Sequence, residues 1–324
     1  MMAHLDAMHN RNKRNSTSCK KFCQNLEQNL EELRQSVING TWKPRGYLSF
    51  IKRDGRKDRL IDYDPEYADN VVQHAIAIVL LPLMKRSLIR DTYSGVRKRG
   101  IHDGMRRVRE ALTTNPDLKE CYVVKTDITK FYPSINIELL KQQLRKKIKD
   151  NRAYDLIAAI IDSHPNGLPI GNYLSQHLAN FFLSPVDHYM KETAGVHYYY
   201  RYCDDIVMLA QDKATAKHYL SVLEERLALL GLSVKANKQV FPISRPGHLD
   251  FLGYVFDGSH IRLRKSIERR LRRLALLYRR RPCLTYAQGL MSYYGWLLWI
   301  PRGLWLWNKV TDGLDLQKVI KDAS

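Results

Sequence analysis

The chain is poor in cysteine, and this narrows its biochemical class. Its five cysteines are an odd number scattered over 324 residues, which argues against a disulfide framework and for a reducing compartment. Cys19 and Cys23 stand four positions apart with no second Cys or His pair nearby, so we interpret them as ordinary thiols and not as half of a zinc site. We therefore expect a cytoplasmic protein.

Long hydrophobic runs are missing as well. The N-terminal stretch MMAHLDAMHNRNKRNSTSCKK lacks the apolar core of a signal peptide. The longest apolar run, AIAIVLLPLM at residues 75–84, is too short to span a bilayer and is typical of a buried helix. The sequence thus predicts no membrane partner.

Acidic residues are heavily outnumbered by basic ones. The chain has 53 Lys and Arg against 33 Asp and Glu, a formal net charge of +20 and a pI near 9.7. Such an excess is typical of proteins that bind polyanions, so nucleic acid is the expected partner. With 44% hydrophobic residues, the chain can bury a substantial core in one large domain or in two to three joined subdomains.

Two adjacent aspartates, Asp204 and Asp205, interrupt the apolar and aromatic stretch YYRYCDDIVMLA. In a single strand their side chains would face opposite ways. A hairpin with strands at residues 200–203 and 206–209 would instead place both carboxylates at its tip, on the same rim. A solvated Asp-Asp turn would have the same pattern, so the pair indicates function only together with further residues.

Asp127 is such a residue, because it stands at the polar end of a β-rich run at residues 122–124. Nucleotidyl transfer uses two divalent cations about 3.5–4 Å apart. Magnesium prefers carboxylate oxygens, which aspartates supply. If the two strands are neighbours in one sheet, the three aspartates predict a site for two Mg²⁺ ions, with Mn²⁺ as the alternative.

The order of predicted elements mixes helices with separated strands and indicates an α+β architecture. A hairpin with an Asp-Gly turn is predicted at residues 46–63. Amphipathic or apolar helices are predicted at residues 21–40, 69–89, 99–114, 137–149 and 153–163.

Several motifs resemble reverse transcriptases. KTDITKFYPSI resembles their first palm motif, and YRYCDDIVM resembles their YxDD hairpin with Cys203 at the variable position. GLPIGNYLSQHLANFFL resembles the segment under the nascent base pair, GLSVKANKQVF the lysine-bearing loop of the palm, and DFLGYVF the primer grip. These five motifs occur in the family's order. The resemblance implies an RNA-directed DNA polymerase that uses dNTPs and two metal ions.

The resemblance also implies a right-hand polymerase architecture. It places an N-terminal extension and fingers at residues 1–120 and a palm with an antiparallel sheet at residues 121–260. A helical part of the fingers is inserted in the palm at about residues 136–170, and a helical thumb follows at residues 261–324.

Individual side chains are assigned by the same resemblance. Asp127, Asp204 and Asp205 match the catalytic metal ligands. Lys238 matches the candidate general acid that protonates the leaving pyrophosphate, with a solvated loop lysine as the alternative. Tyr132 matches the steric-gate aromatic that excludes a ribose 2′-hydroxyl, with an ordinary core tyrosine as the alternative.

Lys57 and Arg59 resemble the fingers residues that grip the incoming triphosphate, for which an ammonium or a guanidinium fork is suited. An exposed basic hairpin would have the same composition. Both residues are therefore candidate substrate contacts.

Residues 262–281 hold ten Lys and Arg and one Glu, and resemble a thumb helix laid along the phosphates of an RNA–DNA duplex. A solvated basic helix is the alternative. The predicted nucleic-acid contacts are Arg262, Arg264, Lys265, Arg269, Arg270, Arg272 and Arg273. An apolar helix at residues 291–310 is expected to pack beneath. Its tryptophans are expected in the core and not on a base-stacking platform: Trp296, Trp299, Trp305 and Trp307.

The segment GLPIGNYLSQ narrows the family. Most reverse transcriptases have a Gln before the glycine that corresponds to Gly171, and here that residue is Ile170. Gln176 stands where intron-type and retron enzymes usually have a Pro. The I-G-N-x-x-S-Q pattern resembles the enzymes of diversity-generating retroelements, which copy a template RNA with errors at adenines. We assign Ile170, Gly171 and Gln176 to substrate binding.

This type implies a bacterial or phage-encoded enzyme whose partners are a template RNA and a basic pentameric accessory protein. A branched apolar side chain at Ile170 would remove a directional contact to the nucleotide, although Ile170 could equally serve only in packing. Two alternatives remain open: a retron or defence-associated reverse transcriptase, and an RNA-binding protein whose catalysis is vestigial.

Overall fold

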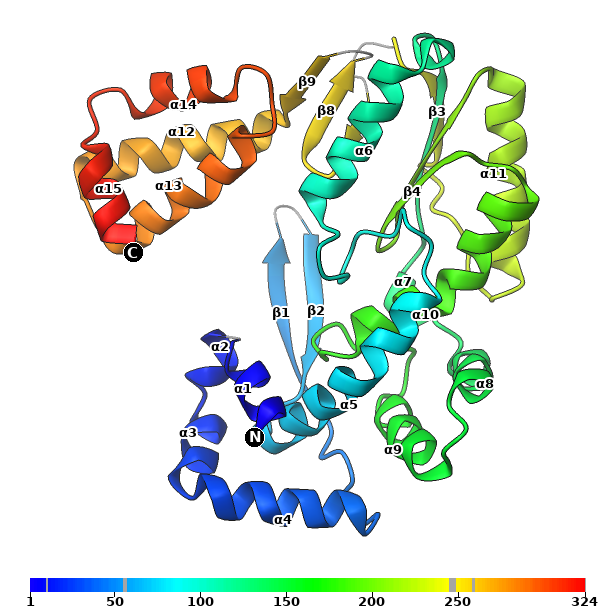
Figure 1. Ribbon diagram of the computed structural model, residues 1–324, viewed down its shortest axis with the longest axis vertical. Coiled ribbons are helices and arrows are strands. Elements are labelled where there is room, and N and C mark those ends of the chain that lie inside the picture. Colours follow the sequence, from blue (N-terminus) through cyan, green and yellow to red (C-terminus); the bar gives the residue numbers. More distant parts are fainter. Residues whose placement is uncertain (10, 55–56, 245–248, 258–259, 324) are drawn as a thin grey trace.

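A computed structural model describes residues 1–9, 11–54, 57–244, 249–257 and 260–323 (Figure 1). Helices are mixed with three antiparallel sheets, which confirms the predicted α+β class. The predicted first hairpin is present as β1 (Leu48–Asp54) and β2 (Lys57–Tyr63), which pair antiparallel and project between the other parts of the molecule. The Gly55 and Arg56 positions of its turn lie outside the described residues.

A four-stranded sheet forms the centre of the molecule, in the order β4-β5-β3-β6. Its strands are β3 (Tyr122–Asp127), β4 (Tyr198–Tyr202), β5 (Asp205–Ala210) and β6 (Gln239–Pro242). Strand β5 is buried on both faces after its first residue. Met208 on one face belongs to one hydrophobic cluster, and Val207 on the other face belongs to a second cluster. The sheet is therefore fixed between two cores, which makes its register well determined.

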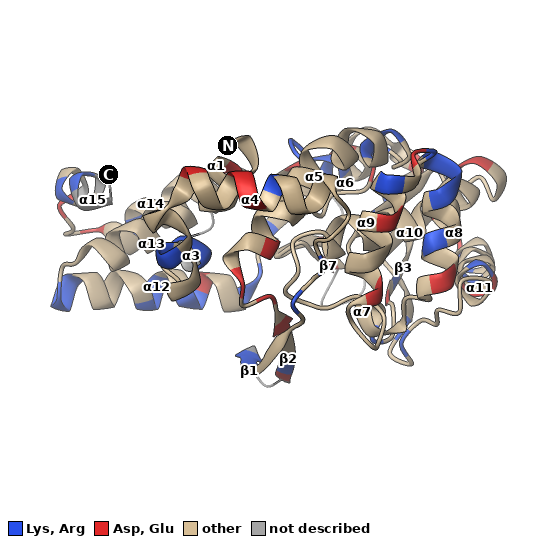
Figure 2. Ribbon diagram, turned by 90° about the horizontal axis from the view of Figure 1, so that it is seen from below, with Lys and Arg blue, Asp and Glu red and all other residues tan. Residues whose placement is uncertain are grey.

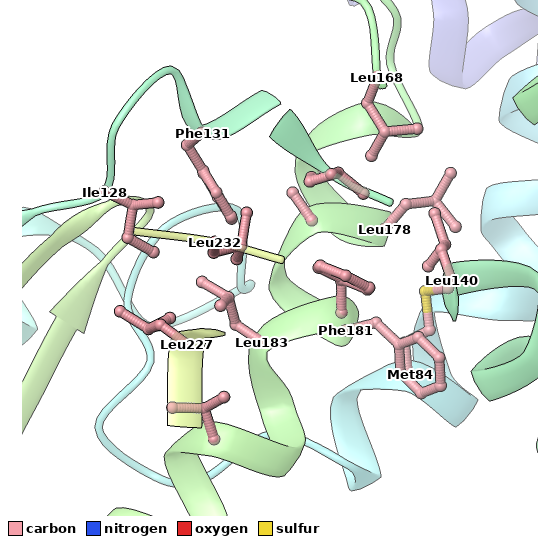
Figure 3. Close-up of a cluster of buried hydrophobic side chains, with 14 of the residues drawn as sticks. Met84, Ile128, Phe131, Leu140, Leu168, Leu178, Phe181, Leu183, Leu227 and Leu232 are labelled. Carbon is pink, nitrogen blue, oxygen red and sulfur yellow. The ribbon is translucent and has the colours of Figure 1, made fainter. Parts of the chain in front are cut away.

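The first of these two cores joins segments that are far apart in the sequence (Figure 3). Phe181 of α10 (Ser175–His188), Leu140 of α8 (Ile137–Lys147) and Leu227 of α11 (Lys213–Ala228) contribute to it. The neighbouring helix α9 (Asn151–Asp162) turns Ile157, Ile160 and Ile161 inward. The helices predicted around residues 137–149 and 153–163 are thus present.

Helix α5 (Tyr67–Arg86) is longer than the apolar run that predicted it. It is the one helix of the described residues that is long and apolar enough to cross a membrane by length and composition, and 61% of its most apolar window is buried inside the protein. That burial is typical of a core helix. The helix is not buried all round, because Val79 is 70% exposed.

The prediction of one helix over residues 21–40 is wrong. The described residues of the N-terminal region form four helices instead: α1 (Met2–Met8), α2 (Arg11–Arg14), α3 (Thr17–Gln24) and α4 (Leu26–Ile38). The chain breaks at Asn25, whose φ of −125° and ψ of 55° are not helical. Asn29 stabilises the break by donating a hydrogen bond from its side chain to the Phe22 carbonyl at 2.8 Å.

The second core lies under α6 (Ile101–Thr114) and a three-stranded sheet of β7 (Leu249–Phe251), β8 (Tyr254–Asp257) and β9 (His260–Leu263). From β9 the chain enters a lobe of helices that stands apart in Figure 1. The lobe is made of α12 (Lys265–Arg280), α13 (Leu284–Leu297), α14 (Gly303–Thr311) and α15 (Leu316–Ala323).

The apolar stretch at residues 291–310 forms two helices and not the single one predicted. The break falls at Pro301 and Gly303, and a Cβ at Gly303 would lie 1.7 Å from the Leu297 carbonyl oxygen, so only glycine fits this close turn. The break also reorients the tryptophans. Trp307 is buried as predicted, but Trp305 is 59% exposed and Trp299 is 37% exposed, which contradicts the core assignment of both.

Candidate active site at one end of the central sheet

The three aspartates meet at one end of the central sheet. Asp127 is the last residue of β3 and Asp205 is the first residue of β5, and the two are directly opposite each other in the antiparallel register. Opposite residues of antiparallel strands present their side chains on the same face. Asp204 precedes β5 in the turn, and its carbonyl accepts a hydrogen bond from the Ile128 amide at 3.2 Å. The predicted neighbour relation of the two strands is confirmed.

A two-residue turn of Cys203 and Asp204 joins β4 to β5, because Tyr202 pairs with Asp205. The turn therefore lies one residue earlier than predicted, and Asp205 is the first residue of a strand and not part of the tip. Cys203 has a φ of 57°, a left-handed conformation that is costly for a residue with a Cβ. Two contacts hold the turn in place. Arg201 donates to the Cys203 carbonyl at 3.1 Å, and the Tyr132 hydroxyl lies 3.4 Å from the Cys203 sulfur.

Burial and like charge make the site electrostatically expensive. Burial raises the pKa of Asp205 to about 7, and the charges of Asp127 and Asp204 add to the rise while Lys125 opposes it. Burial likewise raises the pKa of Asp204, again with a contribution from Asp127. A cation placed among these carboxylates would relieve both costs.

Lys235 contacts two of these carboxylates, and it was not among the site residues predicted from the sequence. Its ammonium lies 2.8 Å from an oxygen of Asp127 and 4.0 Å from one of Asp204. Lys238, the predicted general acid of the same loop, instead bonds Glu224 of α11. The GLSVKANKQVF motif does not distinguish the two lysines, because only the path of the loop determines which one reaches the aspartates. The role of Lys238 stays a prediction.

The carboxylate oxygens of the three aspartates are ligands that hard divalent cations prefer. The Lys235 ammonium contacts two of these carboxylates. Among the described residues, no three His, Cys, Asp or Glu side chains are close enough together to hold a metal ion as they stand. However, the buried Oδ1 of Asp205 finds no hydrogen-bond partner in the described part of the chain. A buried, partnerless carboxylate oxygen is costly unless a cation binds it. Asp127, Asp204 and Asp205 are therefore suited to such ions.

The predicted steric gate Tyr132 lies at this site. It belongs to the short helix α7 (Phe131–Ser134), and burial together with the nearby Cys203 raises the pKa of its hydroxyl. Gly167 approaches it closely, with a φ of +56° and space so restricted that a Cβ would lie 2.3 Å from the Tyr132 carbonyl oxygen. The Tyr132 hydroxyl thus contacts the Asp turn, while the backbone of Tyr132 packs against the segment that leads to Ile170.

The segment after Ile170 is attached to the first hairpin. A Cβ on Gly171 would lie 2.3 Å from the Asp62 carbonyl oxygen of β2, which explains the glycine. Ile170 itself is partly exposed. Gln176 lies at the start of α10 and donates to the Ser94 hydroxyl at 2.6 Å, so its amide is engaged within the protein.

Of the two predicted triphosphate contacts, the structure describes the side chain of Arg59 but not that of Lys57. Arg59 lies on β2 opposite Lys52, and its charge partly offsets the rise in the pKa of Asp204, so the guanidinium lies within electrostatic reach of the aspartate site. The side chain of Lys57 lies outside the described residues. Arg59 is thus brought near the site, and Lys57 stays a prediction.

The basic helix α12 presents only part of its charge to solvent. Figure 2 shows its Lys and Arg on the side of the molecule from which β1 and β2 project. Arg264 is occupied by a bidentate contact to Asp250, at 2.8 Å and 2.9 Å from its Nε, and Arg272 bonds Glu268 at 2.7 Å. The exposed predicted contacts whose side chains form no ion pair among the described residues are Arg262, Lys265, Arg269, Arg270 and Arg273.

A buried ion pair beneath the aspartate turn was left out of the predicted site. Arg201 and Asp187 are both fully buried and lie 2.6 Å apart. Asn180 and Tyr199 complete the network, Asn180 accepting from Arg201 at 2.9 Å and Tyr199 donating to Asp187 at 2.8 Å. Since Arg201 also bonds the Cys203 carbonyl, the network positions the turn that carries Asp204. The sequence feature that could have indicated a buried ion pair is the single arginine, Arg201, within the aromatic strand YYYRY.

Comparison with known proteins agrees with this geometry. Residues 57–256 match the family described as reverse transcriptase (RNA-dependent DNA polymerase). Protein YkfC of Escherichia coli K12 is 25% identical over 174 residues, 50% of this chain and 45% of YkfC. The retron Ec73 reverse transcriptase of Escherichia coli is 28% identical over 183 residues, 52% of this chain and 58% of the retron enzyme. The chain thus spans about half the length of the curated relatives it matches.

Solved telomerase structures have a similar fold. Apo telomerase from Candida tropicalis, truncated from its C-terminal domain, gives a TM-score of 0.53 at 14% identity over 72% of this chain and 59% of that one. Telomerase from Candida albicans in complex with a TWJ fragment of telomeric RNA gives 0.53 at 10% identity over 87% and 62%. These likenesses show the predicted right-hand polymerase fold. The match to the reverse transcriptase family, over residues 57–256, covers more than half of the chain. The chain therefore belongs to the reverse transcriptase (RNA-dependent DNA polymerase) family.

Proposed function

We propose that this chain is an RNA-directed DNA polymerase that copies a retroelement template RNA into cDNA by two-metal nucleotidyl transfer. The observation that carries the proposal is the register of the central sheet, which sets Asp127 directly opposite Asp205, whose buried Oδ1 finds no hydrogen-bond partner among the described residues. The test is extension of a labelled DNA primer on an RNA template by the purified chain with Mg²⁺ and dNTPs. A chain that is folded and binds the hybrid but extends no primer would refute the proposal.

The roles of the side chains follow from where they lie. Two bound Mg²⁺ ions, or Mn²⁺ in their place, would activate the primer 3′-hydroxyl and neutralise the triphosphate. Asp127, Asp204 and Asp205 would hold them. Arg59 would contact the triphosphate, since its charge already reaches Asp204. The partly buried ring of Tyr132 would exclude a ribose 2′-hydroxyl, because its hydroxyl contacts the Asp turn.

The domain assignment is part of the proposal. The four-stranded sheet and the β7–β9 sheet support a palm at residues 121–260, and α8 and α9 lie in the insertion proposed at about residues 136–170. Residues 1–120 would form the N-terminal extension and fingers, and residues 261–324 the thumb. The exposed basic residues of α12 would then face the RNA–DNA duplex.

We further propose the diversity-generating type, supported by Ile170 and Gln176. Ile170 has no polar group with which to make a directional contact to the nucleotide, and the side-chain nitrogen of Gln176, predicted to bind substrate, donates to Ser94 instead. On this assignment the enzyme is bacterial or phage-encoded and cytoplasmic, and a basic pentameric accessory protein assists it. The retron type is the second candidate, favoured by the similarity to the retron Ec73 enzyme.

The Ile170→Gln variant is expected to lower misincorporation opposite template adenines, by about three- to tenfold. The new amide would restore a polar contact to the nascent base pair and with it some discrimination between bases. The overall rate should persist because no metal ligand is changed. Sequencing of cDNA made from one defined RNA by both proteins, with whatever accessory factor activity requires, measures the effect.

Ile170→Leu is the matched control, since it keeps an apolar side chain of the same volume. It should retain the adenine bias of the wild type. A wild-type error spectrum without adenine bias would refute the diversity-generating assignment. An adenine bias that is the same in the glutamine variant would refute only the role of Ile170.

Lys235→Ala is expected to lower the half-saturating Mg²⁺ concentration of primer extension about two- to fivefold. The Lys235 ammonium competes with a cation for Asp127 and Asp204, and the contact has the strength of a partly exposed ion pair. Lys238→Ala should leave this concentration unchanged. If Lys238 is the general acid, its removal should instead lower the maximal rate about 10²-fold.

Magnesium titrations of the two variants separate these roles. An unchanged magnesium curve for Lys235→Ala would contradict the competition. An unchanged maximal rate for Lys238→Ala would contradict the general-acid assignment.

A further inference from the structure

A cavity of about 400 Å³ opens in the helical lobe, between strand β9, helix α12 and the turn that joins α13 to α14. Its volume is within the range of sites that bind small organic groups. Arg262 of β9, Arg272 of α12 and Arg302 of the turn line it, together with Ile300 and Trp305. None of the roles proposed for the aspartate site uses this cavity.

The cavity carries an excess of positive charge. Its lining includes three guanidinium groups, of Arg262, Arg272 and Arg302, but only one carboxylate, that of Glu268, which bonds Arg272. Neither Arg262 nor Arg302 forms an ion pair with any side chain that the structure describes, and both are exposed. Exposed guanidinium groups that form no such ion pair can donate hydrogen bonds to phosphate oxygens.

An aromatic ring stands beside this charge. Trp305 is 59% exposed, although Trp307, two residues later on the same helix, is 6% exposed. The helix α14 therefore presents one tryptophan to the core and the other to the cavity. Lys309 adds a further cation, its Nζ lying 5.0 Å from the centroid of the Trp305 ring. Exposed aromatic rings beside basic side chains are the features with which proteins bind unpaired nucleotides.

The cavity takes in Arg262 and Arg272, two of the predicted duplex contacts, but Arg269 and Arg273 do not line it. At 100° per residue, Glu268 and Arg272 are one turn apart on the flank toward α14. Arg269 and Arg273 lie 100° further round the helix from Glu268 and Arg272, and Trp305 and Leu306 of α14 line the cavity opposite Glu268 and Arg272. Figure 1 shows α14 and β9 on the same side of α12. A strand held in the cavity would thus be separate from the duplex along α12.

We propose that this cavity binds an unpaired nucleotide of a single strand that continues beyond the RNA–DNA duplex. The base stacks on Trp305, and the adjoining phosphates contact Arg262 and Arg302. The strand is either the template RNA outside the copied region or a single-stranded end of the cDNA, which offer the same chemistry. The proposal rests on the proposed polymerase function for its ligand, but strand binding is measured without catalysis.

The experiment measures the affinity of the whole chain for a short, unstructured, fluorescently labelled RNA by anisotropy. The protein is first saturated with an unlabelled RNA–DNA duplex, so that the polymerase cleft is filled. A second arm uses a single-stranded DNA of the same sequence. We expect the wild type to bind, and Trp305→Ala to weaken binding about tenfold, as for the loss of one base stack.

Three further variants define the result. Trp305→Phe keeps a stacking ring and should retain most of the affinity. Leu304→Ala removes a neighbouring side chain that is also exposed, at 55%, and should change nothing. Arg302→Gln should weaken binding and lower the slope of log affinity against log salt by about 0.7, the loss of one phosphate contact to a single strand. Because Arg302 lies on an exposed turn, its substitution should leave the protein folded. The Arg302→Gln variant therefore tests strand binding even if Trp305→Ala is unstable.

Tighter binding of RNA would identify the template RNA as the ligand, and tighter binding of DNA would identify the cDNA end. Wild-type affinity in both Trp305→Ala and Arg302→Gln would overturn the proposal. Primer extension on a short template that ends within the duplex should be normal in all these variants. If the wild type binds the single strand but extends no primer, the proposed polymerase function fails while the strand site stands.

Discussion

Replacing Asp205 by asparagine is expected to lower primer extension at least about 10³-fold, which corresponds to about 4 kcal/mol of transition-state stabilisation. The substitution keeps the size of the side chain but removes the charge that would bind a cation. Asp205 lies opposite Asp127 in the sheet, so the loss occurs where the two strands present their carboxylates together. Steady-state extension on an RNA template measures it, and Asp127→Asn and Asp204→Asn should behave alike.

The same variant should be at least as stable as the wild type. Burial raises the pKa of Asp205 to about 7, so above this pH the folded protein bears the cost of a buried ionised carboxylate. Asparagine removes that cost, and the melting temperature at pH 8 should stay equal or rise. Asp212→Asn, at the N-cap of α11, is the matched control because asparagine also caps helices well. Full extension by Asp205→Asn would contradict the assignment of this residue.

Replacing Arg201 by methionine is expected to destabilise the fold by about 3–5 kcal/mol, because it leaves the buried Asp187 carboxylate without its cation. The two side chains are both fully buried, so solvent cannot take over the role of Arg201. A loss of that size is a large fraction of the stability of a typical domain. Denaturant unfolding of the wild type and the variant measures the difference.

A double variant separates stability from the positioning of the aspartate turn. Arg201→Met with Asp187→Leu removes both charges, and we expect much of the lost stability to return. Extension should stay low, because no donor then holds the Cys203 carbonyl in its left-handed turn. If the double variant recovers activity along with stability, Arg201 serves the fold alone.

The aspartate hairpin could be predicted from the sequence because local rules determine it. Two adjacent carboxylates within an apolar run require a turn, and the observed turn falls at Cys203 and Asp204. The strand that carries Asp127 was predicted from its β-rich run, but its place beside β5 came from the family resemblance. Pairing between strands so distant in the chain depends on the whole fold.

Other parts of the site could not be predicted because tertiary contacts determine them. Lys235 and Lys238 are three positions apart in one loop, and only the former reaches the aspartates. The burial of Arg201 depends on Asp187, which a different helix supplies. Trp305 is exposed because the chain breaks before α14, whereas a single continuous helix had been expected. In each case the composition was known and the direction of the side chain was not.

The measurement that tests the central claim most directly is RNA-templated primer extension in a metal-free buffer to which Mg²⁺ is added back. The wild type should extend no primer in the presence of a chelator and should recover with added Mg²⁺. Asp205→Asn should bind the RNA–DNA duplex as the wild type does and should not recover at any Mg²⁺ concentration. Extension that persists in chelator, or that Asp205→Asn regains with Mg²⁺, would contradict a metal-dependent polymerase built on Asp127, Asp204 and Asp205.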